Sequence, residues 1–263
     1  MPEGAGGIRV LARALRILEA LGAGHGESLA ELARATGLPR STVHRILAAL
    51  EGEGYLEQDG AGRYRASLRL VLLGQRVLGQ NALLAAVRPA MRRLLAATGE
   101  TVFCGTLDDE GVLVLDVLPS SRPISPLPRP GSRAPAHASS MGKVLLAHLP
   151  AAAQGRFLAR PLPRFTPHTI TEPPRLADAL QQARQTGYAV NAEEEDLGVA
   201  CVAAPVRDAS GQVVAALSVA APAPRMWEAG LPRFVGLVSD AAERASRSLG
   251  WTGPRQEAWR RPG

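Results

Sequence analysis

A tight turn between two short helices, in residues 28–50, constrains the fold more than any other part of this sequence. Ser28 and Glu31 form a capping box, in which the hydroxyl and the carboxylate each satisfy an orphan backbone amide of a helix's first turn. That helix ends at Gly37, because glycine readily adopts the left-handed conformation that closes a helix. Pro39 suits the first position of the next helix, where its missing amide hydrogen is not needed. The sequence therefore predicts helix, tight turn and helix.

The second of these helices has a candidate DNA-binding face. Its packed face is formed by apolar residues at spacings of three and four, which are Val43, Ile46, Leu47 and Leu50. Its other face carries arginine, histidine and small hydroxyl side chains, which are Arg40, Ser41, Thr42, His44 and Arg45. Arginine can grip guanine bidentately, and serine or threonine can bond phosphates or base edges. An ordinary solvated helix face is the alternative, because two exposed arginines on one helix are common.

A helix precedes this pair and a hairpin follows it. Apolar residues at helical spacing predict a first helix ending near Gly22, with a buried stripe of Ile8, Leu11, Leu15 and Leu18. Residues 55–58 and 63–65 alternate and are joined by Asp59-Gly60-Ala61-Gly62, which is a hairpin signal. Arg63, beside the tip of this wing, is placed to contact a phosphate or the minor groove. Three helices followed by a wing predict a winged helix-turn-helix.

Composition and charge limit the kinds of binding partner and the cellular compartment that we expect for this protein. A formal charge of +6 and an isoelectric point near 10.3 suit a polyanionic partner, although the charge alone is a weak indication. Two cysteines, Cys104 and Cys201, are too few for a disulfide framework and lack partners at metal-ligand spacing. No apolar run approaches the roughly 20 residues of a membrane helix, and residues 1–7 lack signal-peptide features. We therefore expect a soluble, cytoplasmic protein without a metal, a cofactor or a membrane partner.

The remainder of the chain predicts a linker helix and a larger α+β domain. Residues 67–79 are apolar on several faces, which is typical of a buried helix, here between subunits. A helical stripe follows, in which Pro89 either kinks the helix or starts a new one. Two hairpins are predicted from paired β-rich segments, at residues 101–107 with 112–117 and residues 199–206 with 213–220. Helical segments near residues 141–148, 175–186 and 228–249 would cover an antiparallel sheet.

Motifs in both halves resemble the isocitrate lyase regulator (IclR) family of bacterial transcription regulators. The N-terminal ones are Gly37-Leu38-Pro39-Arg40-Ser41-Thr42-Val43-His44-Arg45-Ile46-Leu47, Glu53-Gly54-Tyr55 and Gly62-Arg63-Tyr64. The C-terminal ones are residues 98–102, His137-Ala138-Ser139, Gly142-Lys143, residues 165–170, Gly187-Tyr188, residues 201–206 and residues 216–219. Their order over roughly residues 8–250 makes coincidence improbable.

This resemblance implies an organisation and a set of partners. It implies a winged helix-turn-helix in residues 8–66, a linker and dimerisation helix in residues 67–80, a GAF-like effector-binding domain in residues 81–250 and a flexible tail in residues 251–263. The implied partners are a double-stranded DNA operator, a small organic acid and further copies of the chain, as a dimer or a dimer of dimers. One small winged module makes too few contacts for tight binding, so the operator should be roughly palindromic.

The resemblance also implies an effector site. The family's positions fall, one at a time, on Ser140, Met141, Asn191, Cys201, Ser218 and Ala220. Core packing is the alternative for Cys201 and Ser218, because small buried residues in apolar strands are common. The family's glyoxylate and pyruvate responders carry an aspartate and a serine where this chain has Asn191 and Ala220, and a glycine-alanine pair where it has Ser140-Met141. We therefore expect a bulkier ligand, such as an aromatic acid.

An enzyme is the rival class of function. Cys201, or Ser139 with His137, would be its nucleophile, as in a hydrolase. The sequence lacks a Gly-x-Ser-x-Gly elbow, and Val144 stands where a phosphate loop needs a hydroxyl. The acidic run of residues 193–196 is typical of a solvated turn. We therefore expect a regulator without catalysis, acting as a repressor or an activator.

Overall fold

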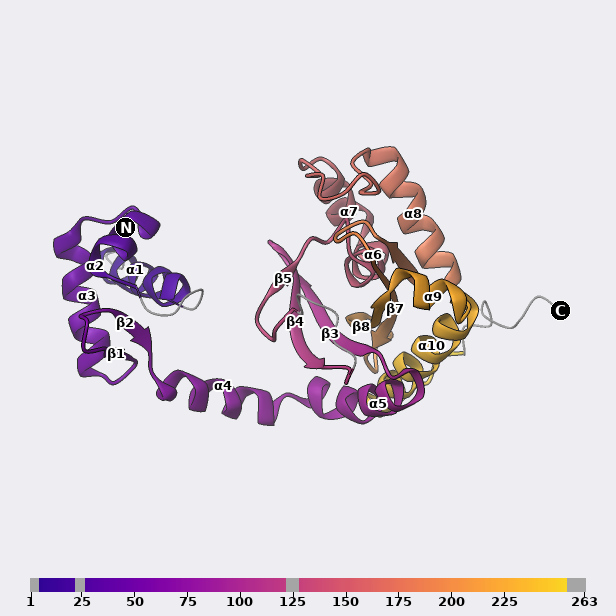
Figure 1. The fold of residues 1–263 in the computed structure, drawn as a ribbon, viewed down its shortest axis with the longest axis horizontal. Helices are drawn as coiled ribbons and strands as arrows, with labels where there is room; N and C mark the ends of the chain where they lie inside the picture. The colour runs from indigo at the N-terminus through magenta and orange to yellow at the C-terminus, as the bar shows by residue number, and fades with distance from the viewer. Residues whose placement is uncertain (1–4, 22–26, 122–127, 255–263) are drawn as a thin grey trace. The chain divides into compact units, whose positions relative to one another are not determined.

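The computed structural model describes residues 5–21, 27–121 and 128–254, and most of the predicted tail over residues 251–263 lies outside them. The chain divides into two compact units, Met1–Gln80 and Asn81–Gly263. The N-terminal unit contains α1 (Ala5–Leu21), α2 (Leu29–Thr36), α3 (Arg40–Gly52), β1 (Leu56–Gln58), β2 (Tyr64–Ala66) and α4 (Leu68–Gln80), as Figure 1 shows.

The turn between α2 and α3 forms as its sequence predicts. Ser28 caps α2: its Oγ accepts a hydrogen bond from the Glu31 amide at 3.3 Å, and its own amide donates to Glu31 Oε2 at 2.8 Å. Gly37 closes this helix with φ of 67°. Pro39 is the N-cap of α3 rather than its first residue, because its ψ of 140° is extended. Its carbonyl accepts the first bonds of that helix, from the amides of Thr42 and Val43.

The buried stripe of α1 differs from the predicted one. Leu11 and Leu15 are exposed, at 61% and 51%, and the side chain of Ile8 lies outside the described residues. Ile17 and Leu21 are buried instead, with Ala14 and Leu18 packed beside them. The helix carries two apolar stripes at helical spacing, and the one that meets α2 and α3 becomes the core.

Helix α4 forms over the predicted linker segment. In a single chain its apolar side chains lie open to solvent, with exposed fractions of 74% for Leu68, 52% for Val71, 59% for Leu72 and 51% for Leu73. The burial of this helix between subunits therefore stays a prediction.

The C-terminal unit is an antiparallel sheet between two layers of helices, so the α+β prediction is confirmed. Its elements are α5 (Ala82–Thr98), β3 (Thr101–Asp108), β4 (Gly111–Leu118), β5 (Arg133–Ala134), α6 (Ser140–Ala147), α7 (Ala151–Leu158), α8 (Pro173–Thr186), β6 (Ala189–Ala192), β7 (Val199–Arg207), β8 (Val213–Pro222), α9 (Ala223–Glu228) and α10 (Leu231–Ser248). The strand order is β5-β4-β3-β8-β7-β6. Helices α5 and α10 pack on one face, and α6, backed by α8, packs on the other.

Both predicted hairpins are present, as β3–β4 and β7–β8. Helix α5 begins at its N-cap Asn81 and continues through Pro89, so the proline does not start a new helix. The helix expected over residues 228–249 is α10, which begins only at Leu231 because Gly230, with φ of 88°, separates it from α9. The short elements α7, α9, β5 and β6 have no counterpart in the sequence-based expectations.

Strand alternation decides which face each side chain occupies. On β8, Leu217 and Val219 join the core under α5 and α10, whereas Ala216 and Ala220 join the core under α6. Cys201 on β7 and Ala189 on β6 also belong to the α6 side. The predicted effector-site residues on the strands therefore share one face of the sheet.

Candidate functional site

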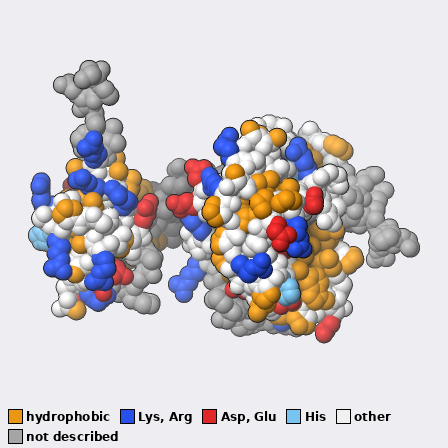
Figure 2. All heavy atoms as spheres, turned by 90° about the horizontal axis from the view of Figure 1, so that it is seen from above, with side chains coloured by type: hydrophobic (Ala, Val, Ile, Leu, Met, Phe, Trp, Pro, Cys, Tyr) orange, Lys and Arg blue, Asp and Glu red, His pale blue; other side chains and the backbone are white. Residues whose placement is uncertain are grey.

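The exposed face of α3 is the candidate DNA-binding surface. Arg40, Ser41, His44 and Arg45 are exposed there, and Thr42 is half-buried beside them. None of these five side chains makes a hydrogen bond or ion pair with another described residue, so each is available to an outside partner. On the visible face of the N-terminal unit, Figure 2 shows many arginine side chains and few acidic ones.

The wing is held against α2 by a charge pair. Strands β1 and β2 pair in antiparallel register, and Glu27 adds a bridge to Tyr64. Arg63 Nη2 lies 3.3 Å from Glu31 Oε2, and both side chains are 42% exposed. Hydrogen bonds from Ser28, aided by Arg63, hold the pKa of Glu31 below its usual value. Arg63 therefore lies beside the tip, as predicted, but it is engaged with α2, and its contact with a phosphate stays a prediction.

The six predicted effector-site residues lie close together where the N-terminus of α6 meets β6, β7 and β8. Ser140 Oγ and Ser218 Oγ are 3.1 Å apart and buried. Cys201 is the direct partner of Asn191 on one side and of Ala220 on the other. Met141 belongs to the same apolar core as Ala220. Five of the six are buried, and Cys201 is half-buried.

Several hydrogen-bond donors in this cluster lack acceptors. Ser139 Oγ caps α6 by accepting from the Gly142 amide at 3.1 Å. The amides of Ser140 and Met141 have no acceptor among the residues that the structure describes. Asn191 accepts from the Glu194 amide at 2.7 Å through Oδ1, and its Nδ2 group has no acceptor in the described part of the chain. An acceptor placed here would give these donors the hydrogen bonds that the described residues do not supply.

A buried ion pair borders the cluster and was not predicted. Lys143 Nζ donates to Glu194 Oε1, with the two side chains 5% and 8% exposed. The expectation of a solvated turn over residues 193–196 is therefore wrong for Glu194, which the tertiary structure buries against α6. Lys143 is the only lysine in the sequence, and its place one turn after Ser140 was the available signal.

The residues of the rival enzyme hypothesis have structural partners. His137 Nε2 lies 2.9 Å from the Pro163 carbonyl, and Ser139 caps α6. Burial raises the pKa of the Cys201 thiol to about 12, which disfavours the nucleophilic thiolate. Among the described residues, no group of three or more histidine, cysteine or acidic side chains is placed to hold a metal ion.

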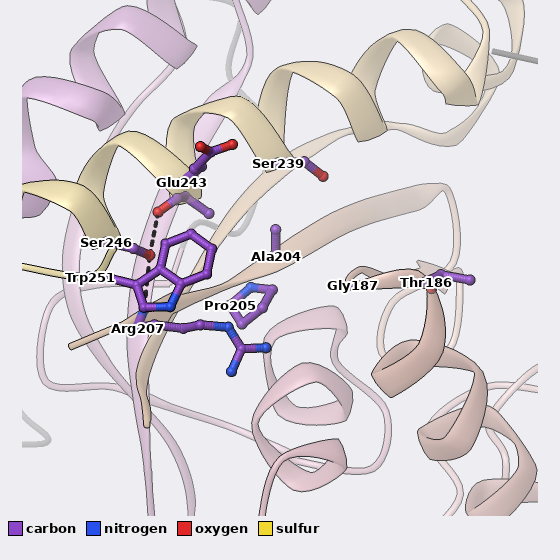
Figure 3. A pocket seen from close by; sticks show the side chains of 10 residues that line it. Thr186, Gly187, Ala204, Pro205, Arg207, Ser239, Glu243, Ser246 and Trp251 are labelled. Carbon is purple, nitrogen blue, oxygen red and sulfur yellow. Dashed lines mark hydrogen bonds between the residues drawn. The ribbon is translucent and has the colours of Figure 1, made fainter. Parts of the chain in front are cut away.

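Some cavities of the C-terminal unit lie away from the predicted cluster, among them the following two. The first, in Figure 3, is formed by β7, α10 and Trp251, and its volume of about 30 Å³ holds little more than a water molecule. Its walls include Arg207 and Ser246, which are joined by a 2.8 Å hydrogen bond from the Arg207 amide to Ser246 Oγ. The second, of about 310 Å³, lies beside α7 and is lined by Phe157, Arg156 and others. The predicted effector residues line neither.

Family models match both units of the chain. The model described as "IclR helix-turn-helix domain" matches residues 10–60, and "Bacterial transcriptional regulator IclR C-terminal" matches residues 75–247. The chain belongs to the IclR family. It is an IclR-type DNA-binding transcriptional regulator, and the resemblance seen in its motifs is confirmed. No helix in the described residues has both the length and the apolar character to span a membrane.

Named relatives match over nearly the whole chain. The HTH-type transcriptional regulator BhcR of Paracoccus denitrificans is 37% identical over 262 residues, covering 98% of this chain and 92% of BhcR. The transcriptional repressor IclR of Escherichia coli is 32% identical over 250 residues, covering 93% and 91%.

Solved structures of IclR proteins share the fold. An IclR homolog complexed with 4-hydroxybenzoate, from Microbacterium hydrocarbonoxydans, superposes with a TM-score of 0.82 and 31% identity, covering 91% of this chain and 98% of that one. An IclR transcriptional regulator from Alicyclobacillus acidocaldarius superposes with a TM-score of 0.84 and 27% identity, covering 92% of this chain and 99% of that one.

Proposed function

We propose that this regulator senses a small organic acid, of aromatic rather than keto-acid type, bound between the N-terminus of α6 and strands β6–β8. It works in the cytoplasm, where its DNA lies, and acid binding in the C-terminal unit changes the affinity of the N-terminal unit for an operator. Support comes from the relative that carries 4-hydroxybenzoate, which is an aromatic acid.

The observation that carries this proposal is the set of donors without acceptors. The amides of Ser140 and Met141 lie at the start of α6, where the helix dipole favours a negative charge. Asn191 Nδ2 is a further neutral donor on the facing strands, and the Ser218 hydroxyl, which pairs with Ser140 Oγ, can turn to donate as well. Such donors suit a carboxylate and do not suit a cation.

Ligand size follows from the apolar walls. Met141 and Ala220 offer apolar surface, and Met141 can move because its side chain is flexible and unbranched. A ring has more apolar surface to bury there than a two- or three-carbon keto acid has.

We further propose that the protein binds DNA as a dimer, or as a dimer of dimers, through Arg40, Ser41, Thr42, His44, Arg45 and Arg63. The exposed leucines of α4 support dimerisation, because a helix this apolar is normally covered. Two such modules would read a roughly palindromic operator.

Thermal unfolding of the full chain with benzoate, 4-hydroxybenzoate, succinate, pyruvate and glyoxylate tests the proposed ligand class. An acid at 100 times its dissociation constant should stabilise the protein by about 2.7 kcal/mol. Ser218→Val should abolish the shift, whereas Arg156→Ala, in the cavity beside α7, should preserve it. In a second experiment, a DNA duplex that the protein binds is selected from a random library. The affinity of the protein for this duplex is then measured with and without the same acids, and an acid that binds should change it. A response to pyruvate or glyoxylate alone would contradict the proposed class, and a response that survives Ser218→Val would misplace the site.

A further inference from the structure

Glu194 connects the predicted acid site to the segments around it. Its carboxylate receives the Lys143 ammonium, and its amide donates to Asn191 Oδ1 at 2.7 Å. Its carbonyl accepts from Thr169 Oγ1 at 2.6 Å, in the segment between α7 and α8. One residue of the β6–β7 turn therefore joins α6, β6 and that segment.

The Lys143–Glu194 pair is incompletely satisfied. Glu194 Oε2 is buried and has no hydrogen-bond partner in the described part of the chain. A buried carboxylate is costly unless its lone pairs are satisfied, so this pair gains less than its geometry suggests. The preceding residue, Glu193, has φ of 61°, a strained value for a residue with a side chain. The turn therefore holds its shape against backbone strain through the contacts of Glu194.

Lys143 lies within the reach of a ligand at the start of α6. It follows Ser140 by three residues, so the two side chains lie on neighbouring positions of one helix face. Its charge acts on Cys201, which belongs to the predicted site. The neutral donors of this site thus border the one buried ammonium of the described residues, and that ammonium is paired with Glu194.

We propose that Lys143 is a further ligand-binding residue, and that the carboxylate of the ligand displaces Glu194 from it. This inference rests on the proposed acid site. Glu194 is thus an internal competitor, because both carboxylates need the same ammonium. Once displaced, it leaves its buried position, since an unpaired buried charge is more costly than a solvated one. Its departure removes the anchor shared by the β6–β7 turn and the Thr169 segment, so binding loosens both.

Competition makes opposite predictions for the two members of the pair. Lys143→Met should weaken benzoate or 4-hydroxybenzoate binding about tenfold or more, because a charge-assisted hydrogen bond is lost. Glu194→Gln should tighten binding by about threefold to tenfold, because a neutral amide holds the ammonium less strongly than a carboxylate does. Asp196→Asn is the matched control, since it removes a nearby exposed charge that does not bond to Lys143. The double variant Lys143→Met with Glu194→Gln should fold with no buried charge and bind as weakly as Lys143→Met.

Calorimetric titration of the full-length variants with both acids at pH 8 supplies the affinities, and melting temperatures report folding. The inference is overturned if Glu194→Gln weakens binding, or tightens it no more than Asp196→Asn does. It is also overturned if the double variant binds like the wild type. If the wild type binds neither acid, the proposed ligand class fails and the inference with it; in the other cases the acid site stands.

The single lysine gives a second readout. In protein labelled with ¹⁵N at the lysine side chain, Lys143 supplies the only side-chain ammonium signal. Benzoate should shift this signal in the wild type. A signal unmoved by saturating acid would overturn the inference even if both variants changed affinity.

Discussion

At the residue scale, the exposed face of α3 offers polar side chains that make no hydrogen bond or ion pair with the other residues the structure describes. Arg45 is exposed and makes no ion pair with another described residue, in contrast to Arg63 and Arg65, which pair with Glu31 and Glu57. A guanidinium without an internal partner can grip a base without first breaking a contact.

Arg45→Ala should therefore cost about 1–3 kcal/mol of operator-binding free energy and relax specificity at one position. Arg34→Ala, which removes an exposed arginine at the end of α2, is the matched control and should have a smaller effect. Fluorescence anisotropy at fixed salt measures both. Equal affinities for the wild type and Arg45→Ala would remove Arg45 from the recognition surface.

The half-buried carboxyl group of Glu195 should make the free energy of unfolding depend on pH. Burial, aided by the neighbouring Asp196, raises its pKa to about 7. Because the folded pKa lies above the unfolded value, folding is favoured while the carboxyl is protonated. That contribution is lost as the pH rises from about 4.5 to about 7.

Glu195→Gln should therefore raise the free energy of unfolding at pH 8 by on the order of 1 kcal/mol, with little effect at pH 4.5. Urea unfolding at the two pH values measures this difference. A gain of equal size at both would show that the ionisation of Glu195 is not the cause.

At the element scale, α6 is positioned by backbone packing at its first turn. A Cβ atom built on Gly142 would lie 2.1 Å from the Ala136 carbonyl oxygen, which is far inside contact distance. This approach holds the cap residues of α6 against the preceding loop, and with them Ser140 and Met141.

Gly142→Ala should destabilise the protein by about 1–3 kcal/mol or more, because backbone must move to admit the methyl group. Gly155→Ala is the matched control: Gly155 lies within α7, and its Cβ would meet nothing within 4 Å. The control should be neutral or stabilising by up to about 1 kcal/mol, since alanine favours helix. Chemical unfolding measures the free energy of unfolding of both variants. If Gly142→Ala is as stable as Gly155→Ala, the close approach of Gly142 to Ala136 is contradicted.

At the scale of the whole molecule, the N-terminal unit exposes large apolar side chains to solvent. They lie on α1, at Val10, Leu11 and Leu15, and on α4, at Leu68, Val71, Leu72 and Leu73. Side chains of this kind in such number are typical of a surface that another chain buries.

Leu72→Glu should weaken dimerisation about tenfold or more, because the carboxylate would lose its hydration at the interface. Leu197→Glu is the control, since Leu197 is 62% exposed in the β6–β7 turn of the other unit. Sedimentation velocity over a range of concentrations gives the dissociation constants. A Leu72→Glu variant that dimerises like the wild type would place the interface elsewhere.

The sequence by itself determined the features that arise from neighbours along the chain. The capping box of Ser28 and Glu31, the left-handed Gly37 and the two long hairpins follow from interactions over a few residues, and each formed as predicted. The exposed face of α3 follows from helical periodicity in the same way. The family motifs added the effector-site positions, which the fold brings together.

Tertiary structure alone decided which of several equivalent local choices was used. Two apolar stripes on α1 are alike in sequence, and docking against α2 and α3 selected the one at Ile17 and Leu21. Glu194 looks like part of a solvated acidic run, yet Lys143, 51 residues earlier, buries it. Ser140 and Ser218 meet across 78 residues only because α6 packs on β8. Such contacts depend on how the helices and strands pack together. Local sequence patterns act over a few residues, so they do not predict contacts between side chains that are distant in sequence.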